Sequence, residues 1–346
     1  MSFVLSHEAP LSGLLYDTET AAAFSIKQDI HAQLRFERAL ARAQAKTGVI
    51  SNEACKAIET ALDDFTIDPD DLTERTRRDG LLSPGLVAAV RATVAPPHDR
   101  AFHKGTTSQD LIDTSLMLRL KALLPRFAGR LETIVDGLAA HASNAELMAH
   151  TRMQVALPIT VSDKISIWQR PLKSALEQVP TVFPLQLGGP VGNGEALADD
   201  FHALANLMAS ELGLSAREAS WHTDRTPLLT IANWALSVTT ALGKIGQDVA
   251  LLSQNEIGAV RLAGGGSSSA MAHKSNPILA ENLVTLARFN ATMIGGLQQA
   301  ALHENERSGV AWTLEWMLFP QLIIATGTAL RNGEELVQKL SFPKPG

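Results

Sequence analysis

The sequence is poor in cysteine and tyrosine, and each scarcity excludes a class of protein. Cys55 is the single cysteine, so no intrachain disulfide can form and most cysteine-based metal sites are excluded. Tyrosine occurs once, hairpin-forming Asn-Gly and Asp-Gly pairs are scarce, and alanine and leucine abound. This composition favours helices over sheets.

Neither a strong positive charge nor a long apolar run is present. The net charge of −6 does not favour nucleic acid or an anionic membrane surface, so an anionic ligand would need a local basic cluster. No apolar run reaches the ~18 residues of a membrane span, and the first residues lack the basic and then apolar layout of a signal peptide. We therefore expect a cytoplasmic protein with no nucleic-acid or membrane partner.

Several catalytic motifs are also missing. The glycine-rich segment 188–194 lacks the spacing of a dinucleotide fingerprint, and His273 stands where a phosphate-binding P-loop needs glycine before Lys274. The sequence has no Gly-x-Ser-x-Gly elbow for a serine nucleophile, and its histidines lack the spacing of a helical zinc pair. We expect neither a cofactor nor a metal.

Long amphipathic segments are what the sequence does contain. Apolar residues recur at spacings of three and four over 111–138, 238–252 and 279–297, which is typical of bundle helices. Helices this long suggest a bundle that is shared between subunits. Further helices are predicted at 29–46, 53–64, 84–93, 159–173 and 317–339.

The predicted fold is all-α, a bundle of long helices. Residues 1–103 are predicted to form an N-terminal helical domain, and 104–346 a central helical-bundle domain with a short C-terminal tail. Between two of the shorter helices, the charged run 74–79 is interpreted as a solvated turn.

The segment 264–277, between two long helices, is the strongest candidate for chemistry. Three glycines and three serines make it a flexible loop, and His273 and Lys274 follow them. An unperturbed serine is a weak base, so Ser268 or Ser269 would need a positive, dry pocket, which Lys274, His273 and backbone N–H groups could supply. The natural target is a carbon acid beside a carboxylate.

A second polar segment, 96–110, precedes the first long helix. Thr107 or Ser108 could be the N-cap, and the free N–H groups of the first helical turn suit an anion. Ser108 and Asp110 could equally serve only as caps. The spacing leaves both interpretations open.

Residues 268–277, Ser-Ser-Ala-Met-Ala-His-Lys-Ser-Asn-Pro, resemble the signature Gly-Ser-Ser-x-Met-Pro-x-Lys-x-Asn of the fumarase/aspartase superfamily. Two positions depart from it, because Ser267 replaces a glycine and Ala272 a proline. The resemblance extends to three other segments, 106–110, 151–154 and 188–192.

This resemblance implies a homotetramer in which long helices form a common core and three chains contribute to each active site. It also implies that Ser268 is the catalytic base and that Lys274 and Asn276 bind a substrate carboxylate. The third, C-terminal domain of the family is expected to be largely missing.

Position 152 separates the branches of the family. Branches that eliminate an amine or water carry Thr-His-x-Gln, whose histidine protonates the leaving group, and Arg152 takes that place here. Arginine keeps its proton at working pH, but a carboxylate leaving group, with a pKa of ~4, needs no acid. The resemblance therefore favours the lactonising branch, the 3-carboxy-cis,cis-muconate cycloisomerases of the protocatechuate (β-ketoadipate) pathway.

The resemblance to that branch implies a small polycarboxylate substrate, which Arg152 could hold by a bidentate contact. The substrate-binding candidates from the matching segments are Lys274, Asn276, Thr107, Ser108, Gln109 and Gln154, and His98 and Arg307 are added to them. His98, His273 and Glu281 could be proton relays, or an ordinary hydrogen-bonded histidine or surface carboxylate.

Two other functions stay open. An adenylosuccinate-type lyase that eliminates fumarate is favoured by the His98-Asp99 and His273-Lys274 pairs and opposed by Arg152. A non-catalytic bundle protein is opposed by the intact signature residues.

Overall fold

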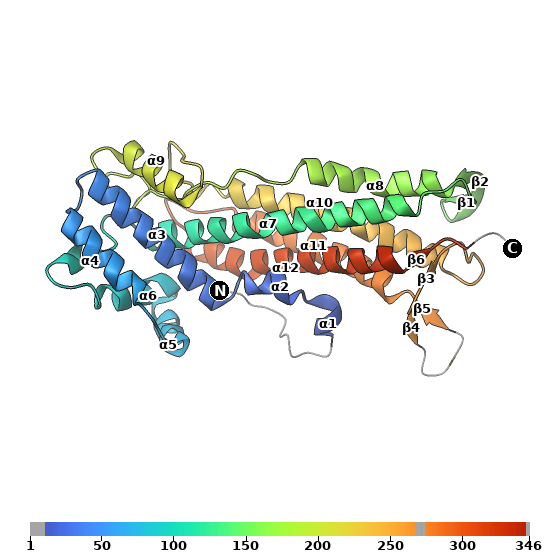
Figure 1. Cartoon of the computed structure of the whole chain (residues 1–346), viewed down its shortest axis with the longest axis horizontal. Helices are drawn as coiled ribbons and strands as arrows, with labels where there is room; N and C mark the ends of the chain where they lie inside the picture. Colours follow the sequence, from blue (N-terminus) through green and yellow to red (C-terminus); the bar gives the residue numbers. More distant parts are fainter. Residues whose placement is uncertain (1–10, 268–270, 272–273, 344–346) are drawn as a thin grey trace.

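The computed structural model of the protein describes residues 11–267, 271 and 274–343. Five helices run along the long axis of the molecule, and smaller helices gather at one end (Figure 1). The five bundle helices are α7 (Ser108–Ala140), α8 (Val161–Glu177), α10 (Thr226–Leu252), α11 (Ile278–Ala300) and α12 (Gly309–Lys339). Two short helices, α1 (Ser12–Leu15) and α2 (Thr18–Ala22), pack on α12. The predicted long-helix bundle is confirmed.

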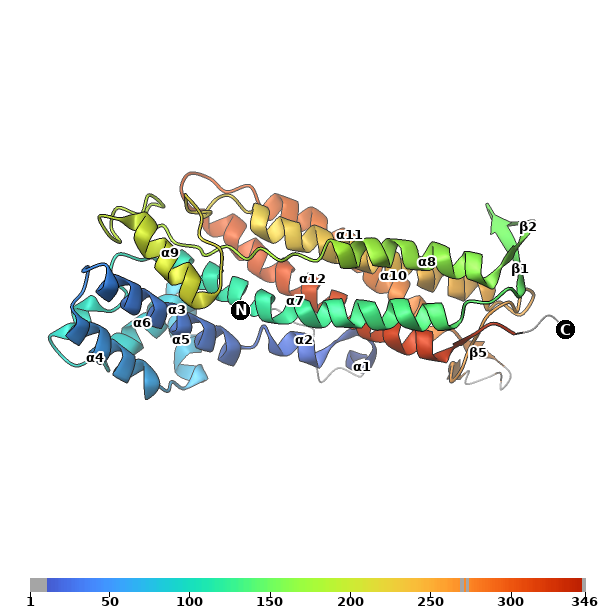
Figure 2. The ribbon, with the colours of Figure 1, turned by 45° about the horizontal axis from the view of Figure 1, so that its top comes forward.

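The smaller helices form a second apolar core beside the bundle. They are α3 (Ile26–Lys46), α4 (Asn52–Asp63), α5 (Pro69–Asp79), α6 (Leu82–Arg91), the 3-10 helix η1 (His98–Ala101) and α9 (Phe201–Leu212). Although α9 comes much later in the chain, it packs against α3 (Figure 2). The N-terminal helices therefore share their core with a segment that lies beyond α8.

Glycine lets the central helices approach closely. A Cβ at Gly246 of α10 would lie 2.5 Å from the carbonyl oxygen of Ala280, and one at Gly243 would lie 2.5 Å from the Cβ of Ala287. Both partners belong to α11. A side chain at either glycine would force the two helices apart, so this crossing depends on glycine.

Every segment predicted to be helical overlaps a helix, but the interpretation of 74–79 as a turn is wrong. These residues complete α5, although they are solvated as expected. Asp68 caps the helix by accepting a hydrogen bond from the backbone N–H of Asp70, and Gly80 ends it with a φ of 72°. Acidic residues in the first turn and basic ones in the last also suit the helix dipole.

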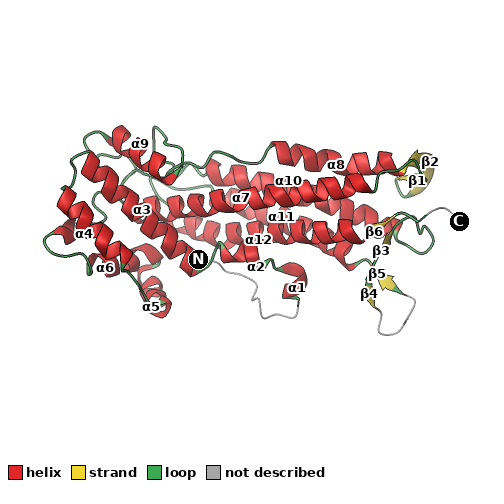
Figure 3. Ribbon diagram, in the orientation of Figure 1, coloured by secondary structure: helices red, strands yellow, loops and turns green. Residues whose placement is uncertain are grey.

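Short strands, none of them predicted, lie at the end of the bundle opposite the small helices (Figure 3). They form three antiparallel pairs. The pairs are β1 (Glu146–Thr151) with β2 (Gln154–Thr160), β3 (Arg261–Leu262) with β6 (Leu340–Ser341), and β4 (Gly266–Ser267) with β5 (Ser275–Asn276).

By length and composition α10 could cross a membrane, contrary to the expectation from apolar runs. Its most apolar window is 61% buried inside the structure. Ile231, Val238 and Leu242 of this helix belong to the main core of the bundle. The apolar character of α10 is therefore that of a central bundle helix.

Candidate active site

The predicted site residues fall into two groups at opposite ends of the bundle. One group lies where α7 begins and comprises Thr107, Ser108, Gln109 and Arg307, which precedes α12. His98, in η1, lies nearby in the chain but packs with η1 against α4. The other group lies near the strands and comprises Arg152, Gln154, Lys274 and Asn276 (Figure 1). Because α7 has 33 residues, it separates its two ends by about 50 Å at 1.5 Å per residue. One chain cannot bring both groups to one ligand.

The predicted base, Ser268, and His273 lie outside the described residues, between the paired strands β4 and β5. Glu281 is exposed in the first turn of α11, just after this segment.

The first group is built around the start of α7, whose N-cap is Thr107. Asp110, which is fully buried, accepts hydrogen bonds from the Thr107 backbone N–H at 3.1 Å and from the Thr106 hydroxyl at 3.0 Å. Asp110 therefore caps the helix, which was one of the two interpretations of this segment. Ser108 and His98 are both partly exposed.

Gln109 and Arg307 lie in contact. The Arg307 Nε–H donates to Gln109 Oε1 at 3.0 Å, and Arg307 Nη2 donates to the carbonyl oxygen of Pro190 at 3.1 Å. Gln109 is fully buried, and its amide nitrogen donates to the His222 carbonyl oxygen at 2.8 Å. The glutamine side chain is thus engaged within its own chain, whereas the partly exposed Arg307 guanidinium keeps further N–H groups for a ligand.

A buried charge cluster lies directly below this group. Arg225 donates to Asp113 at 2.7 Å and to Glu315 at 2.7 Å, and all three residues are buried. Burial alone would lower the pKa of Arg225, but the two carboxylates outweigh it and raise that pKa. Burial raises the pKa of Glu315 despite Arg225. Burial also lowers the pKa of nearby His303, and the charge of Arg225 adds to this effect.

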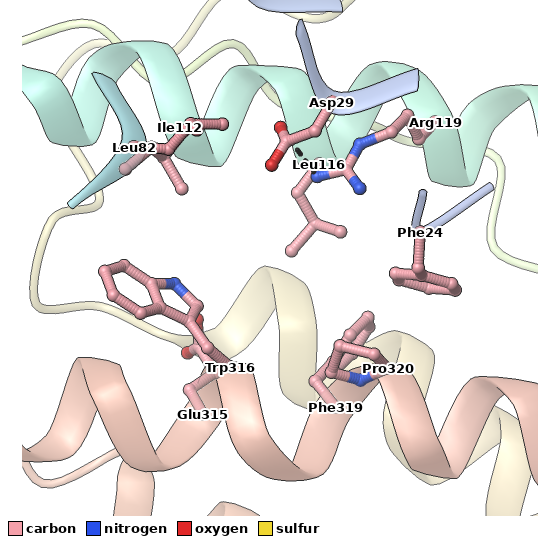
Figure 4. Close-up of a pocket in the computed structure, with 10 residues that line it drawn as sticks. All are labelled: Phe24, Asp29, Leu82, Ile112, Leu116, Arg119, Glu315, Trp316, Phe319 and Pro320. Atoms are coloured by element: carbon pink, nitrogen blue, oxygen red, sulfur yellow. Dashed lines mark ion pairs between the residues drawn. The ribbon is translucent and has the colours of Figure 1, made fainter. Parts of the chain in front are cut away.

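A separate cleft of about 530 Å³ opens between α3, α6, α7 and α12 (Figure 4). Its walls are mostly apolar, and the 3.3 Å ion pair between Asp29 and Arg119 lies in one of them. Burial would raise the pKa of Asp29, but Arg119 and hydrogen bonds from Gln33 and Ser115 outweigh it and lower that pKa. None of the predicted site residues that the structure describes lines this cleft.

Two residues of the second group, Arg152 and Gln154, belong to the β1–β2 hairpin. Thr151 pairs with Gln154, so Arg152 and Met153 form the two-residue turn, with φ angles of 49° and 67°. This is the geometry of a type I′ turn, which normally selects asparagine and glycine. An arginine held there, exposed at the tip, is strained in the way that functional residues often are.

Lys274 and Asn276 lie near the same end of the bundle. Lys274 is exposed, and its backbone N–H donates to the Met271 carbonyl oxygen at 3.1 Å. Asn276 lines a groove of about 770 Å³ together with Arg261 and Ser275. The groove is therefore polar and carries a cationic side chain, as an anion site requires.

Comparison with known proteins identifies the family. The sequence profile of a family described as "Lyase" matches residues 15–291. The 3-carboxy-cis,cis-muconate cycloisomerases of Bradyrhizobium diazoefficiens and Pseudomonas aeruginosa are 34% and 35% identical, each over 92% of this chain and over 74% and 72% of the relative. The chain belongs to this lyase family, the fumarase/aspartase superfamily. The resemblance seen in the signature is confirmed.

A solved lyase agrees in fold. The crystal structure of the 3-carboxy-cis,cis-muconate lactonizing enzyme from Pseudomonas putida superposes with a TM-score of 0.88 at 29% identity. The match covers 97% of this chain and 77% of that one. The long-helix bundle is therefore that of the lyase family.

Some residues beside the first residue group were not found from the sequence. The segment 221–225 shows only a weak polar pattern, yet His222 contacts Asp110 and Arg225 holds two carboxylates. These residues are recognised only by contacts with residues about a hundred positions away in the chain, which the spacing of residues in a local motif does not reveal. Among the described residues, no three acidic, histidine or cysteine side chains are grouped to hold a metal ion.

Proposed function

We propose that the chain is a 3-carboxy-cis,cis-muconate cycloisomerase, which converts its substrate to 4-carboxymuconolactone. The observation that carries this proposal is Arg152. Its guanidinium is permanently protonated, and it stands at the position where other branches of the family have a titrating histidine. Its support is the identity of about a third to relatives that bear this name.

In this reaction a substrate carboxylate forms a C–O bond to one carbon of a double bond. The electron pair moves to the neighbouring carbon, beside another carboxylate, and a proton then joins that carbon. Closing the lactone removes the charge of the attacking carboxylate, so the ionised substrate takes up one proton from solvent, and no oxidant, reductant or other co-reactant is needed. Ser268 transfers the proton, Lys274 and Asn276 hold the carboxylate that carries the developing charge, and Arg152 binds a second carboxylate.

The active site joins the two residue groups from different copies of the chain in a homotetramer. The separation of about 50 Å along α7 requires this if all the predicted residues touch one substrate. Val155 and Leu157 of the Arg152 hairpin, which are 66% and 75% exposed, favour contact with another copy. We place this tetramer in the cytoplasm.

Turnover of the proposed substrate is the direct test. We expect the purified protein to remove the diene absorbance of 3-carboxy-cis,cis-muconate and to release a lactone, which NMR identifies. Adenylosuccinate is offered in parallel and should stay intact. Cleavage of adenylosuccinate, with carboxymuconate unchanged, would instead support the fumarate-eliminating function.

Arg152→Asn tests the residue that separates the branches. Asparagine tolerates the positive φ of 49° at this turn, so the hairpin should persist while the guanidinium is lost. We expect kcat/KM for carboxymuconate to fall about 10²-fold, because a charge-assisted bidentate contact disappears.

Met153→Asn is the matched control, since Met153 occupies the same turn with a φ of 67°. We expect its kcat/KM to stay within about threefold of wild type, as for most surface changes. An equal loss in both variants would assign the effect to hairpin conformation. Arg152→His should not restore lactonisation, because a neutral imidazole cannot replace the fork of donors.

A further inference from the structure

Asp110 is the centre of a buried polar network whose role extends beyond capping α7. Its Oδ2 accepts from the backbone N–H of Gly189 at 2.9 Å, and its Oδ1 accepts from Gln186 Nε2 at 3.3 Å and from His222 Nε2 at 2.9 Å. With the two donors from Thr106 and Thr107, five hydrogen bonds reach one carboxylate that is 0% exposed. Such a set of donors fixes the position of a buried carboxylate.

His222 is oriented by this carboxylate. Since Nε2 contacts Asp110 Oδ1, Nε2 is the nitrogen that carries the hydrogen. His222 is 3% exposed, and within the described part of the chain its Nδ1 has no hydrogen-bond partner. A Cβ at Gly192 would lie 3.2 Å from Nδ1. The imidazole of His222 therefore packs against the glycine-rich loop, and its Nε2 is held by Asp110.

The same contacts close a ring of hydrogen bonds around the first residue group. From Asp110 the ring passes to His222, whose carbonyl oxygen accepts from Gln109, whose Oε1 accepts from Arg307. Arg307 then donates to Pro190, and the neighbouring Gly189 returns to Asp110. The ring joins the start of α7, the loop 188–194, the segment before α10 and the loop before α12.

We infer that His222 is a positioning residue, which through Gln109 and the glycine-rich loop sets the Arg307 guanidinium for a substrate carboxylate. This inference rests on the proposed function for its substrate and on the hydrogen-bond ring for its mechanism. His222 does not touch the reacting atoms, because it lies beneath Gln109 and is buried.

Two substitutions separate the two ring nitrogens. In His222→Gln the amide nitrogen can occupy the place of Nε2 and still donate to Asp110, whereas in His222→Asn the shorter amide reaches only the place of Nδ1. We expect His222→Gln to keep kcat/KM within about threefold of wild type. His222→Asn should lower kcat/KM about 30-fold, mainly through KM, as expected when a substrate-binding group is displaced.

The route through Arg307 is tested by combining variants. In an Arg307→Met background, His222→Asn should add less than about a threefold further loss, because the group that it positions is already gone. His202→Gln on the exposed face of α9 is the control histidine and should behave as wild type. If His222→Asn does not fold, Gln109→Leu replaces it, with the same expected rise in KM and the same non-additivity with Arg307→Met.

Two results would overturn the positioning role. An equal loss in His222→Gln and His222→Asn, with one limb of the pH–kcat profile abolished, would make His222 a proton-transfer group. A full and independent loss in the Arg307→Met background would show that His222 does not act through Arg307. Turnover of carboxymuconate by the wild-type protein is measured first. If the wild-type protein shows no turnover, that result contradicts the proposed function and not the hydrogen-bond ring.

Discussion

Replacing Ser268 with alanine is expected to lower kcat for carboxymuconate about 10³–10⁴-fold, which is the upper range for loss of a positioned proton-transfer group. The substrate carboxylates should still bind through the cationic side chains, so KM should change much less. Stopped assays at high enzyme concentration measure the residual rate, and circular dichroism checks that helicity is unchanged. Activity that survives Ser268→Ala would remove this serine from its assigned role.

Ser269→Ala is the matched comparison, because Ser269 carries the same hydroxyl one position later in the sequence. We expect a clearly smaller loss from this change. The reverse order of effects would move the base to Ser269 while leaving the proposed reaction intact.

Mixing two impaired variants tests whether sites are shared between chains, with the substrate held well below KM, where both parent variants turn over slowly. In the sequence, position 268 directly follows β4, which lies at the strand end of the bundle, whereas Gln109 lies at the start of α7, at the opposite end. If one site draws these residues from different copies, tetramers reassembled from equal amounts of Ser268→Ala and Gln109→Leu should regain activity at about one site in four. No recovery at any mixing ratio would contradict shared sites.

The bundle could be predicted because its helices carry their own signal. Apolar residues at spacings of three and four mark one face of α7, and every such residue from Leu116 to Leu138 in that pattern is buried. The charged run at 74–79 gave no such signal, because α5 buries little. Its helical state depends instead on Asp68 and Gly80 at the two ends.

The hairpin at Arg152 could not be predicted from local sequence. Its turn residues, Arg152 and Met153, are poor formers of a type I′ turn, so tertiary context outweighs local preference. The candidate site, too, could be predicted only in part. Residue types in the signature and at position 152 indicated the chemistry, but the hydrogen bonds of Asp110 and His222 join residues that are 112 positions apart.

Arg225→Met is expected to lower the free energy of unfolding by about 3–5 kcal/mol, because it leaves two buried carboxylates without their cation. Arg225 stands at the start of α10, and its partners Asp113 and Glu315 lie on α7 and α12, so one side chain connects three bundle helices. Methionine keeps most of the side-chain volume. Urea denaturation, followed by circular dichroism, measures the loss.

Arg217→Met is the matched control, since Arg217 pairs with Asp224 at 3.0 Å but both side chains are more than a third exposed. We expect this change to cost at most about 1 kcal/mol, as exposed pairs do. If Arg225→Met costs no more than Arg217→Met, the buried cluster does not hold the three helices together.

The pH dependence of the stability of Arg225→Met tests the same explanation independently. Burial already raises the pKa of Glu315 in the wild-type protein, and losing Arg225 should raise it further. A carboxyl whose folded-state pKa exceeds its unfolded value binds protons more tightly in the folded state, so its cost is greatest at neutral pH. The deficit of Arg225→Met should therefore shrink as the pH falls towards about 4, the ordinary pKa of a carboxyl. Combining Arg225→Met with Asp113→Asn and Glu315→Gln should recover part of the lost stability at pH 7. If neither acid pH nor these two changes reduce the deficit, the loss comes from packing and not from the unpaired carboxylates.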